Sequence, residues 1–301
     1  MAKSATTRAK RPAKKPTTAR ATAKKTATKT TVRKAAVTNN KTKRFQLTAV
    51  GGGDFTASAL LAEFFGTMLL VSAMVITSGN QLLIGFSLIA IAVAFMGISG
   101  VNFNPAVSFG LWATRRMSAL KMVAYWVAQF LGALAAVVVL HLFAREGLSL
   151  SLGSFWSFDW SIFLLEMAGM VVFMFMFMAA VEQKQAVVAK ATTMGLGFFI
   201  GLIIATGYLA QAAQSANASV TTTEQPRISK VSSATLNPAA ALVITENDNS
   251  QSMQLTGQTD SNQPTPASRL TLETILGTLL GAAIGGHLFR LLNSQRKELV
   301  V

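Results

Sequence analysis

Residues 100–107 read Gly-Val-Asn-Phe-Asn-Pro-Ala-Val, and residues 236–240 repeat the centre of this stretch as Leu-Asn-Pro-Ala-Ala. In both copies Asn stands directly before Pro at the start of a short apolar segment. Asn is a preferred N-cap because its side-chain oxygen accepts a hydrogen bond from a free backbone N–H, and Pro at the first helical position lacks only a donor that would stay unpaired. The two copies therefore predict two short helices, whose positive dipole ends face whatever lies between them.

The composition around these segments is typical of a membrane protein. Of the 301 residues, 51% are hydrophobic and only 13% are charged, whereas a soluble domain carries about 25% charged residues. Cysteine is absent, which excludes a disulfide framework, a thiol nucleophile and a Cys-based metal site.

Six segments are long and apolar enough to be membrane spans, since about 20 helical residues cross a hydrocarbon core of about 30 Å. They are residues 57–76, 82–98, 122–143, 162–181, 192–209 and 271–292. The second and fifth contain Gly and are short. We therefore expect an all-α membrane protein with six transmembrane helices and two re-entrant half-helices.

The net charge of +15 comes from one end of the chain, because residues 1–44 hold fifteen Lys and Arg and no acidic residue. We predict a disordered basic tail over residues 1–54, since this composition cannot bury an apolar core. Three interpretations of residues 1–44 stay open: binding to nucleic acid, binding to anionic lipid, or a solvated tail that only sets orientation. The positive-inside rule predicts that this tail and the C-terminal tail, residues 294–301, are cytoplasmic.

The chain also contains an internal repeat. Glu63 and Gly66 open the first span, Glu166 and Gly169 open the fourth, and each Glu-x-x-Gly group precedes an Asn-Pro-Ala group by two spans. Three spans per half is an odd number, so the halves must run in opposite directions across the membrane, as an inverted repeat. The second half is longer because of polar insertions over residues 211–233 and 246–269.

Four segments carry a resemblance to a known family: residues 62–67 (Ala-Glu-Phe-Phe-Gly-Thr), 98–107, 125–133 (Tyr-Trp-Val-Ala-Gln-Phe-Leu-Gly-Ala) and 236–239. The chain resembles the major intrinsic proteins, the aquaporin and glycerol-facilitator family. The resemblance implies an aquaporin-like channel domain over residues 55–293, usually assembled as a homotetramer in the cell membrane. It implies passive passage of water or small uncharged solutes such as glycerol, with no enzymatic activity, cofactor or metal.

The resemblance also implies residue roles. The pore motifs would be Asn104, Pro105, Ala106, Asn237, Pro238 and Ala239, and the re-entrant loops would be held by Glu63 and Glu166. Aligning spacing to these motifs puts the selectivity constriction at Ile84, Ile204, Ala234 and Ala240. Many family members have Arg where this chain has Ala240, so we expect a constriction that is wider and less polar than that of a strict water channel. Arg227 or Lys230 is a hypothetical source of the missing charge.

Two alternatives stay open. A non-conducting protein of the same fold could act in adhesion, or tether nucleic acid or lipid through the basic tail. A secondary transporter is disfavoured because no intramembrane charge pair suggests ion coupling. The run of Met, Val and Phe over residues 170–178 is interpreted as a lipid-facing or packed helix face.

Overall fold

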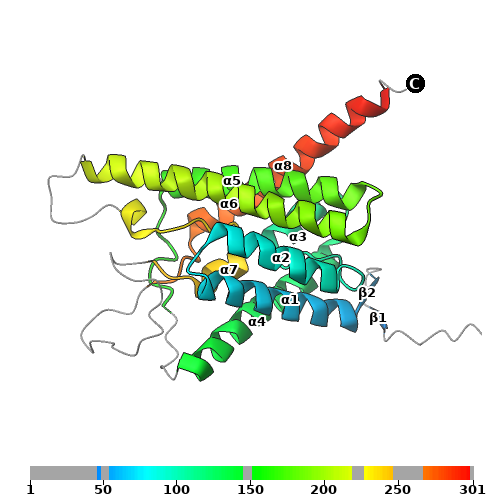
Figure 1. Cartoon of the computed structure of the whole chain (residues 1–301), viewed down its shortest axis with the longest axis horizontal. Coiled ribbons are helices and arrows are strands. Elements are labelled where there is room, and N and C mark those ends of the chain that lie inside the picture. The colour runs from blue at the N-terminus through cyan, green and yellow to red at the C-terminus, as the bar shows by residue number, and fades with distance from the viewer. Residues whose placement is uncertain (1–45, 49–53, 145–150, 219–226, 247–266, 299–301) are drawn as a thin grey trace, which may run out of the picture. The chain divides into compact units, whose positions relative to one another are not determined.

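Eight α-helices account for most of the residues that the computed structural model describes, which are 46–48, 54–144, 151–218, 227–246 and 267–298 (Figure 1). All of these residues belong to one structural unit, residues 43–301. The helices are α1 (Ala57–Ile76), α2 (Gln81–Phe95), α3 (Pro105–Ala113), α4 (Ala119–Ala144), α5 (Trp160–Glu182), α6 (Val187–Ala218), α7 (Pro238–Val243) and α8 (Leu272–Glu298).

The expected six helices and two half-helices are present, and the predicted fold class is confirmed. Within the described residues, α1, α4, α5, α6 and α8 are long and apolar enough to cross a membrane. Helix α2 is also apolar but has only 15 residues, or about 22 Å. Helices α3 and α7, with 9 and 6 residues, lie among the longer helices (Figure 1).

A short two-stranded ribbon precedes α1, which an all-α prediction did not include. Strands β1 (Gln46–Thr48) and β2 (Asp54–Thr56) pair in antiparallel fashion. Strand β1 lies within the predicted tail of residues 1–54, most of which is outside the described residues.

Helix α6 differs most from the sequence-based expectation, because it runs to Ala218 instead of ending near Leu209. The first part of the predicted insertion at 211–233 thus continues the helix. Its alanines pack on a small cluster that also includes the 3-10 helix η1 (Arg227–Lys230). The cluster consists of Ile162, Leu209, Ile228 and Val231, with Ala212, Ala213 and Ala216 against it. The interior of the second insertion, residues 247–266, lies outside the described residues.

The two halves of the chain pack in matching ways. Helix α1 packs on α4 in the first half, and α5 packs on α8 in the second. The halves interlock because α3 contacts α8 and α7 contacts α4, while α2 lies along α6. Each half-helix is thus held partly by the opposite half, which brings residues near 104 and 237 together.

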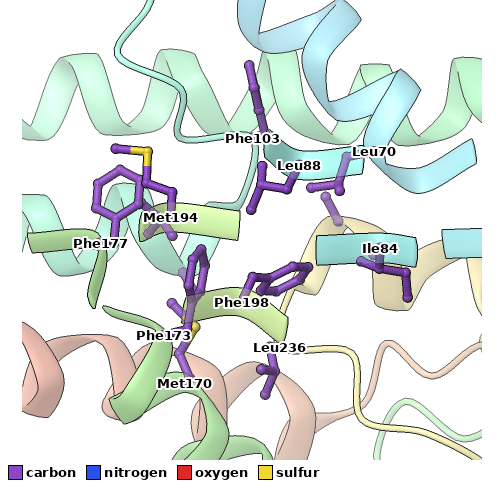
Figure 2. Close-up of a cluster of buried hydrophobic side chains, with 14 of the residues drawn as sticks. Leu70, Ile84, Leu88, Phe103, Met170, Phe173, Phe177, Met194, Phe198 and Leu236 are labelled. Atoms are coloured by element: carbon purple, nitrogen blue, oxygen red, sulfur yellow. The ribbon is translucent and has the colours of Figure 1, made fainter. Parts of the chain in front are cut away.

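The Met- and Phe-rich run at residues 170–178 lies in the interior. Met170, Phe173, Met174, Phe177 and Met178 are all buried, and Figure 2 shows Phe173 close to Phe198 of α6. The sequence left open whether this run forms a lipid-facing or a packed helix face, and these five residues lie on a packed face. The core between the halves is therefore built from large, flexible and aromatic side chains.

Gly132 of α4 lies where two helices touch, and we predict that Gly132→Ala lowers the melting temperature of the purified protein in detergent. An added Cβ would lie 2.3 Å from the carbonyl oxygen of Phe64 in α1, so the backbones must separate, at about 1–3 kcal/mol. This exceeds the gain in helix propensity, about 1 kcal/mol.

The matched control is Gly207→Ala, since Gly207 is also helical but a Cβ there would meet nothing within 4 Å. It should leave the melting temperature unchanged or raise it. Equal melting temperatures for the two variants would contradict the close approach of α1 and α4.

Candidate functional site

The N-terminus of each half-helix is capped by the Asn of its Asn-Pro-Ala group. Asn104 Oδ1 accepts from the backbone N–H of Ala106 at 2.8 Å. Asn237 Oδ1 accepts from the N–H groups of Ala239 and Ala240 at 3.0 and 3.4 Å. Because a backbone N–H can only donate, the oxygen of each carboxamide must face its own helix, and the NH2 group must point away from it.

The two NH2 groups cross to the opposite loop. Asn104 Nδ2 donates to the carbonyl oxygen of Leu236 at 2.7 Å, and Asn237 Nδ2 donates to the carbonyl oxygen of Phe103 at 3.0 Å. Each carboxamide has two N–H groups, so each Asn keeps a second donor. The halves of the chain, more than 130 residues apart at these bonds, are therefore joined at the starts of their short helices.

Backbone strain marks the same position in both halves. Phe103 and Leu236, each directly before its Asn, have φ angles of +49° and +50°. Bulky L-residues rarely adopt this left-handed conformation, at a cost of about 1–3 kcal/mol. Here it accompanies the paired orientation of two carbonyls that accept from the opposite Asn. Such local strain is typical of functional sites.

The Glu-x-x-Gly groups hold these strained residues. Glu63 accepts from the N–H groups of Asn102 and Phe103 at 3.1 and 2.8 Å, with one carboxylate oxygen for each. The Gly three residues later leaves space for a side chain of the loop, because a Cβ on Gly66 would lie 2.0 Å from the Phe103 ring.

The second half repeats this arrangement. Glu166 accepts from the N–H groups of Thr235 and Leu236 at 2.9 and 2.8 Å. A Cβ on Gly169 would lie 2.8 Å from the Leu236 side chain. In both halves, therefore, Glu holds the backbone and Gly makes room for the residue before Asn.

Helix α4 supplies further support to the first loop. Tyr125 donates its hydroxyl to the carbonyl of Ser99 at 2.9 Å, and Trp126 donates its indole N–H to the carbonyl of Pro105 at 2.8 Å. Gln129 donates to Glu63 at 2.8 Å. Segment 125–133 carried the family resemblance, but its sequence alone assigned no contact to these three side chains.

The four residues proposed for a constriction are not equally placed. Ile84, Ala234 and Ala240 are buried members of the main hydrophobic cluster, whereas Ile204 is only half-buried and is not one of its buried members. Two residues further along α6, the Thr206 hydroxyl accepts from the N–H of Ala234 at 3.1 Å. Spacing alone could not single out Thr206, because an insertion separates it from the second motif.

Of the two cations considered from sequence, Arg227 is engaged elsewhere. Its Nη2 lies 2.5 Å from Glu246 and its Nη1 lies 2.6 Å from the fully buried Glu273. Both contacts are ion pairs between the guanidinium and a carboxylate. Burial opposes ionisation of Arg227, but Glu246 and Glu273 raise its pKa above the ordinary value. Lys230 is half-buried in the same 3-10 helix.

A third cation, Arg269, reaches the second loop. Its Nη1 donates to the carbonyl of Ser233 at 2.6 Å, and its Nη2 donates to Glu166 at 3.0 Å. Burial lowers the pKa of the Arg269 guanidinium, while the Glu166 carboxylate opposes that shift. Sequence reasoning missed Arg269 because it lies at the far end of the second insertion. The expectation that the spans contain no charge pair was therefore wrong, since Arg269 pairs with Glu166 of α5.

One side of the Asn pair opens towards a narrow apolar cavity. Its lining includes Asn104 and Asn102, but most of it is apolar: Leu70, Leu88, Val101, Phe173, Phe177, Met194 and Phe198. The cavity is too narrow to hold the centre of a water molecule. Figure 2 shows the rings of Phe173, Phe177 and Phe198 gathered at this point, beside Met194.

Comparisons with known proteins identify a family for this chain. The family model described as Major intrinsic protein matches residues 54–222, more than half of the chain. The chain is 42% identical over 106 residues to Aquaporin Z of Brucella melitensis, covering 30% of this chain and 46% of that protein. It is 42% identical over 101 residues to a glycerol uptake facilitator protein-like 6 of Lactiplantibacillus plantarum, covering 31% of this chain and 47% of that protein.

The matched region thus spans about half the length of these curated relatives. Among solved structures, the aquaglyceroporin of Plasmodium falciparum aligns with a TM-score of 0.46 and 17% identity, covering 77% of this chain and 93% of that one. The match to the family model decides the assignment: this chain is an integral membrane protein that belongs to the major intrinsic protein family.

Proposed function

We propose that this protein is a passive channel for water and small uncharged solutes such as glycerol. The observation that carries the proposal is the reciprocal hydrogen bonding of Asn104 and Asn237 to the carbonyls of the opposite loops. Members of this family are passive channels and not enzymes, and the relatives named above are an aquaporin and a glycerol uptake facilitator.

The chemistry of the Asn pair suits a neutral, hydroxylic solute. The second N–H of each carboxamide can donate to a passing hydroxyl, and loop carbonyls can accept from it. A cation instead meets the positive ends of α3 and α7 and cannot regain its hydration there. The site therefore favours solutes that exchange hydrogen bonds without carrying charge.

We propose that Ile84, Ile204, Ala234 and Ala240 form the selectivity constriction, and that it is wider and less polar than that of a strict water channel. The alignment of spacing to the two Asn-Pro-Ala motifs supports these positions, and Ile84, Ala234 and Ala240 are buried apolar residues. The contact of Thr206 with Ala234 makes Thr206 a further candidate on α6.

Replacing Ala240 with Arg tests this constriction. We expect Ala240→Arg to lower permeability to glycerol and larger polyols while water permeability is retained, because a guanidinium at this position would narrow the passage and add donors. Light scattering by proteoliposomes measures polyol permeability under a polyol gradient and water permeability under a sucrose gradient. Unchanged polyol flux would exclude Ala240 from the narrowest point.

A second candidate function, a non-conducting protein of the same fold, is favoured by one observation. The cavity beside Asn104 does not admit a water molecule in this conformation. Under this alternative the protein would act in adhesion, or its basic residues 1–44 would tether nucleic acid or anionic lipid.

We also propose that the protein is a homotetramer in the cell membrane, as the family resemblance implies. The charge distribution predicts that both termini are cytoplasmic.

Stopped-flow swelling of proteoliposomes under water, glycerol and urea gradients separates the two candidates. If the protein is a channel, water or solute flux exceeds that of empty vesicles. The activation energy of permeation then falls towards that of free diffusion in water. The matched variant Asn104→Ala/Asn237→Ala should lose most of this flux. Wild-type flux equal to that of empty vesicles would support the non-conducting alternative.

A further inference from the structure

The internal repeat identifies an asymmetry in how the two re-entrant loops are held. Gly132 of α4 and Gly281 of α8 occupy matching positions, because a Cβ would lie 2.3 Å from the carbonyl of Phe64 in the first case and 2.4 Å from that of Met167 in the second. Phe64 and Met167 directly follow the two loop-holding Glu residues. Gln129 and Thr278 each lie three residues before these glycines, so they also occupy matching positions in the two halves.

In the first half, Gln129 is the side-chain donor that α4 provides to the buried Glu63. Its Nε2 donates to Glu63 at 2.8 Å and to the Ser108 hydroxyl at 3.1 Å. Both acceptors are buried. Glu63, the α3 half-helix and α4 are thereby connected by one neutral carboxamide.

The second half lacks both members of this arrangement. Thr278 donates to the carbonyls of Thr274 and Ile275 in its own helix, at 2.7 and 3.1 Å. The position equivalent to Ser108, four residues after the motif Asn, is Ala241, which has no hydroxyl. Helix α8 therefore provides no side-chain hydrogen bond to Glu166 in the described residues.

Glu166 accepts from the Thr235 hydroxyl of its own loop at 3.1 Å, and Arg269, in the segment that precedes α8, supplies the donor from outside the loop that Gln129 supplies in the first half. Its guanidinium contacts both Glu166 and the carbonyl of Ser233. Its own backbone is held against the end of α7, since Arg269 N donates to the carbonyl of Ile244 at 2.8 Å. The neighbouring Ser268 hydroxyl donates to the carbonyls of Ala241 and Leu242. The side chain is 2% exposed, so its charge is balanced within the protein.

We propose that Arg269 is the positioning residue of the second re-entrant loop, filling the role that Gln129 has in the first. It acts through Glu166 and the carbonyl of Ser233, and so aligns the Leu236 carbonyl with the Asn104 carboxamide. Its effect on permeability rests on the proposed channel function, whereas its effect on the loop does not.

Hydrogen exchange tests the effect on the loop. In Arg269→Ala the amides of Thr235 and Leu236 should exchange faster by about tenfold or more, while those of Asn102 and Phe103 keep their wild-type rates. Adding Thr278→Gln should restore slow exchange, because it recreates the Gln129 arrangement beside Glu166. The repeat supports this rescue: residue 278 lies three positions before Gly281, as Gln129 lies three positions before Gly132, and both glycines meet the residue after the loop-holding Glu.

Water permeability provides the functional measurement. At equal amounts of folded protein, Arg269→Ala should reduce it by about tenfold, and the double variant Arg269→Ala/Thr278→Gln should recover most of it. The matched control is Arg116→Ala, which removes an Arg from the exposed pair with Glu182 and should alter neither measurement.

The outcomes separate the two proposals. Absence of wild-type flux overturns the proposed function but leaves the exchange experiment decisive for Arg269. Wild-type exchange at Thr235 and Leu236 in Arg269→Ala, or equally fast exchange in both loops, overturns the positioning role. If Arg269→Ala does not fold, the double variant must fold, and Arg269→Gln must exchange at an intermediate rate; failure of either result also overturns it.

Discussion

Replacing Phe198 with alanine is expected to raise the water permeability of the protein by about tenfold, which corresponds to a barrier lower by about 1.4 kcal/mol. The Phe198 ring lies 4.7 Å from that of Phe173, centroid to centroid, and both rings line the cavity beside Asn104. Apolar constrictions block passage by excluding water. Removing one ring widens the point where α5 and α6 face each other and lets water reach the Asn pair.

The same result is expected for Phe173→Ala, because it removes the other ring of the pair. The matched control is Phe175→Ala on the same helix, whose ring packs on Phe289 at 5.5 Å and does not line the cavity. Phe-to-Ala changes at buried positions destabilise by about 3–5 kcal/mol, so flux must be normalised to folded protein. Flux equal to that of wild type in both cavity variants would mean that the aromatic cluster does not limit passage.

Replacing Glu63 with glutamine should destabilise the protein almost as much as replacing it with alanine. Each carboxylate oxygen of Glu63 accepts from a different backbone N–H, those of Asn102 and Phe103. A carboxamide has one oxygen and one NH2 group, so one buried N–H must lose its acceptor and face a donor instead. An unsatisfied buried group costs about 1–3 kcal/mol, which lowers the melting temperature by roughly 2–10 °C for a chain of this size.

Because Glu and Gln have nearly the same size, Glu63→Gln tests the carboxylate charge and its second acceptor oxygen without changing the shape of the side chain. Glu182→Gln is the matched control, because Glu182 pairs with Arg116 near the surface, and such pairs contribute about 0–1 kcal/mol. We expect Glu63→Gln to lose most water flux, since the Phe103 carbonyl that accepts from Asn237 would move. A melting temperature and flux like those of wild type would show that the first loop holds its conformation without Glu63.

Much of the fold prediction depended on interactions between residues that are close in the sequence. The caps of α3 and α7 could be read from sequence because their hydrogen bonds join residues only two or three positions apart. Hydropathy located the long helices, and the family resemblance indicated the two Glu residues, which contact the loops in the structure. The least accurate boundary was that of α6, where polar residues continue a helix whose alanines pack on η1.

The sequence by itself determined the fold class and the two Asn-Pro-Ala groups, because helix caps and hydropathy depend on short stretches of chain, and its motifs carried the resemblance to the family. Only the tertiary structure decided which distant side chains meet. Arg269 reaches Glu166 across 103 positions, and Phe198 reaches Phe173 from another helix. Such contacts follow from how the helices pack around one another, and packing directions are not encoded in the spacing of residues along any one helix.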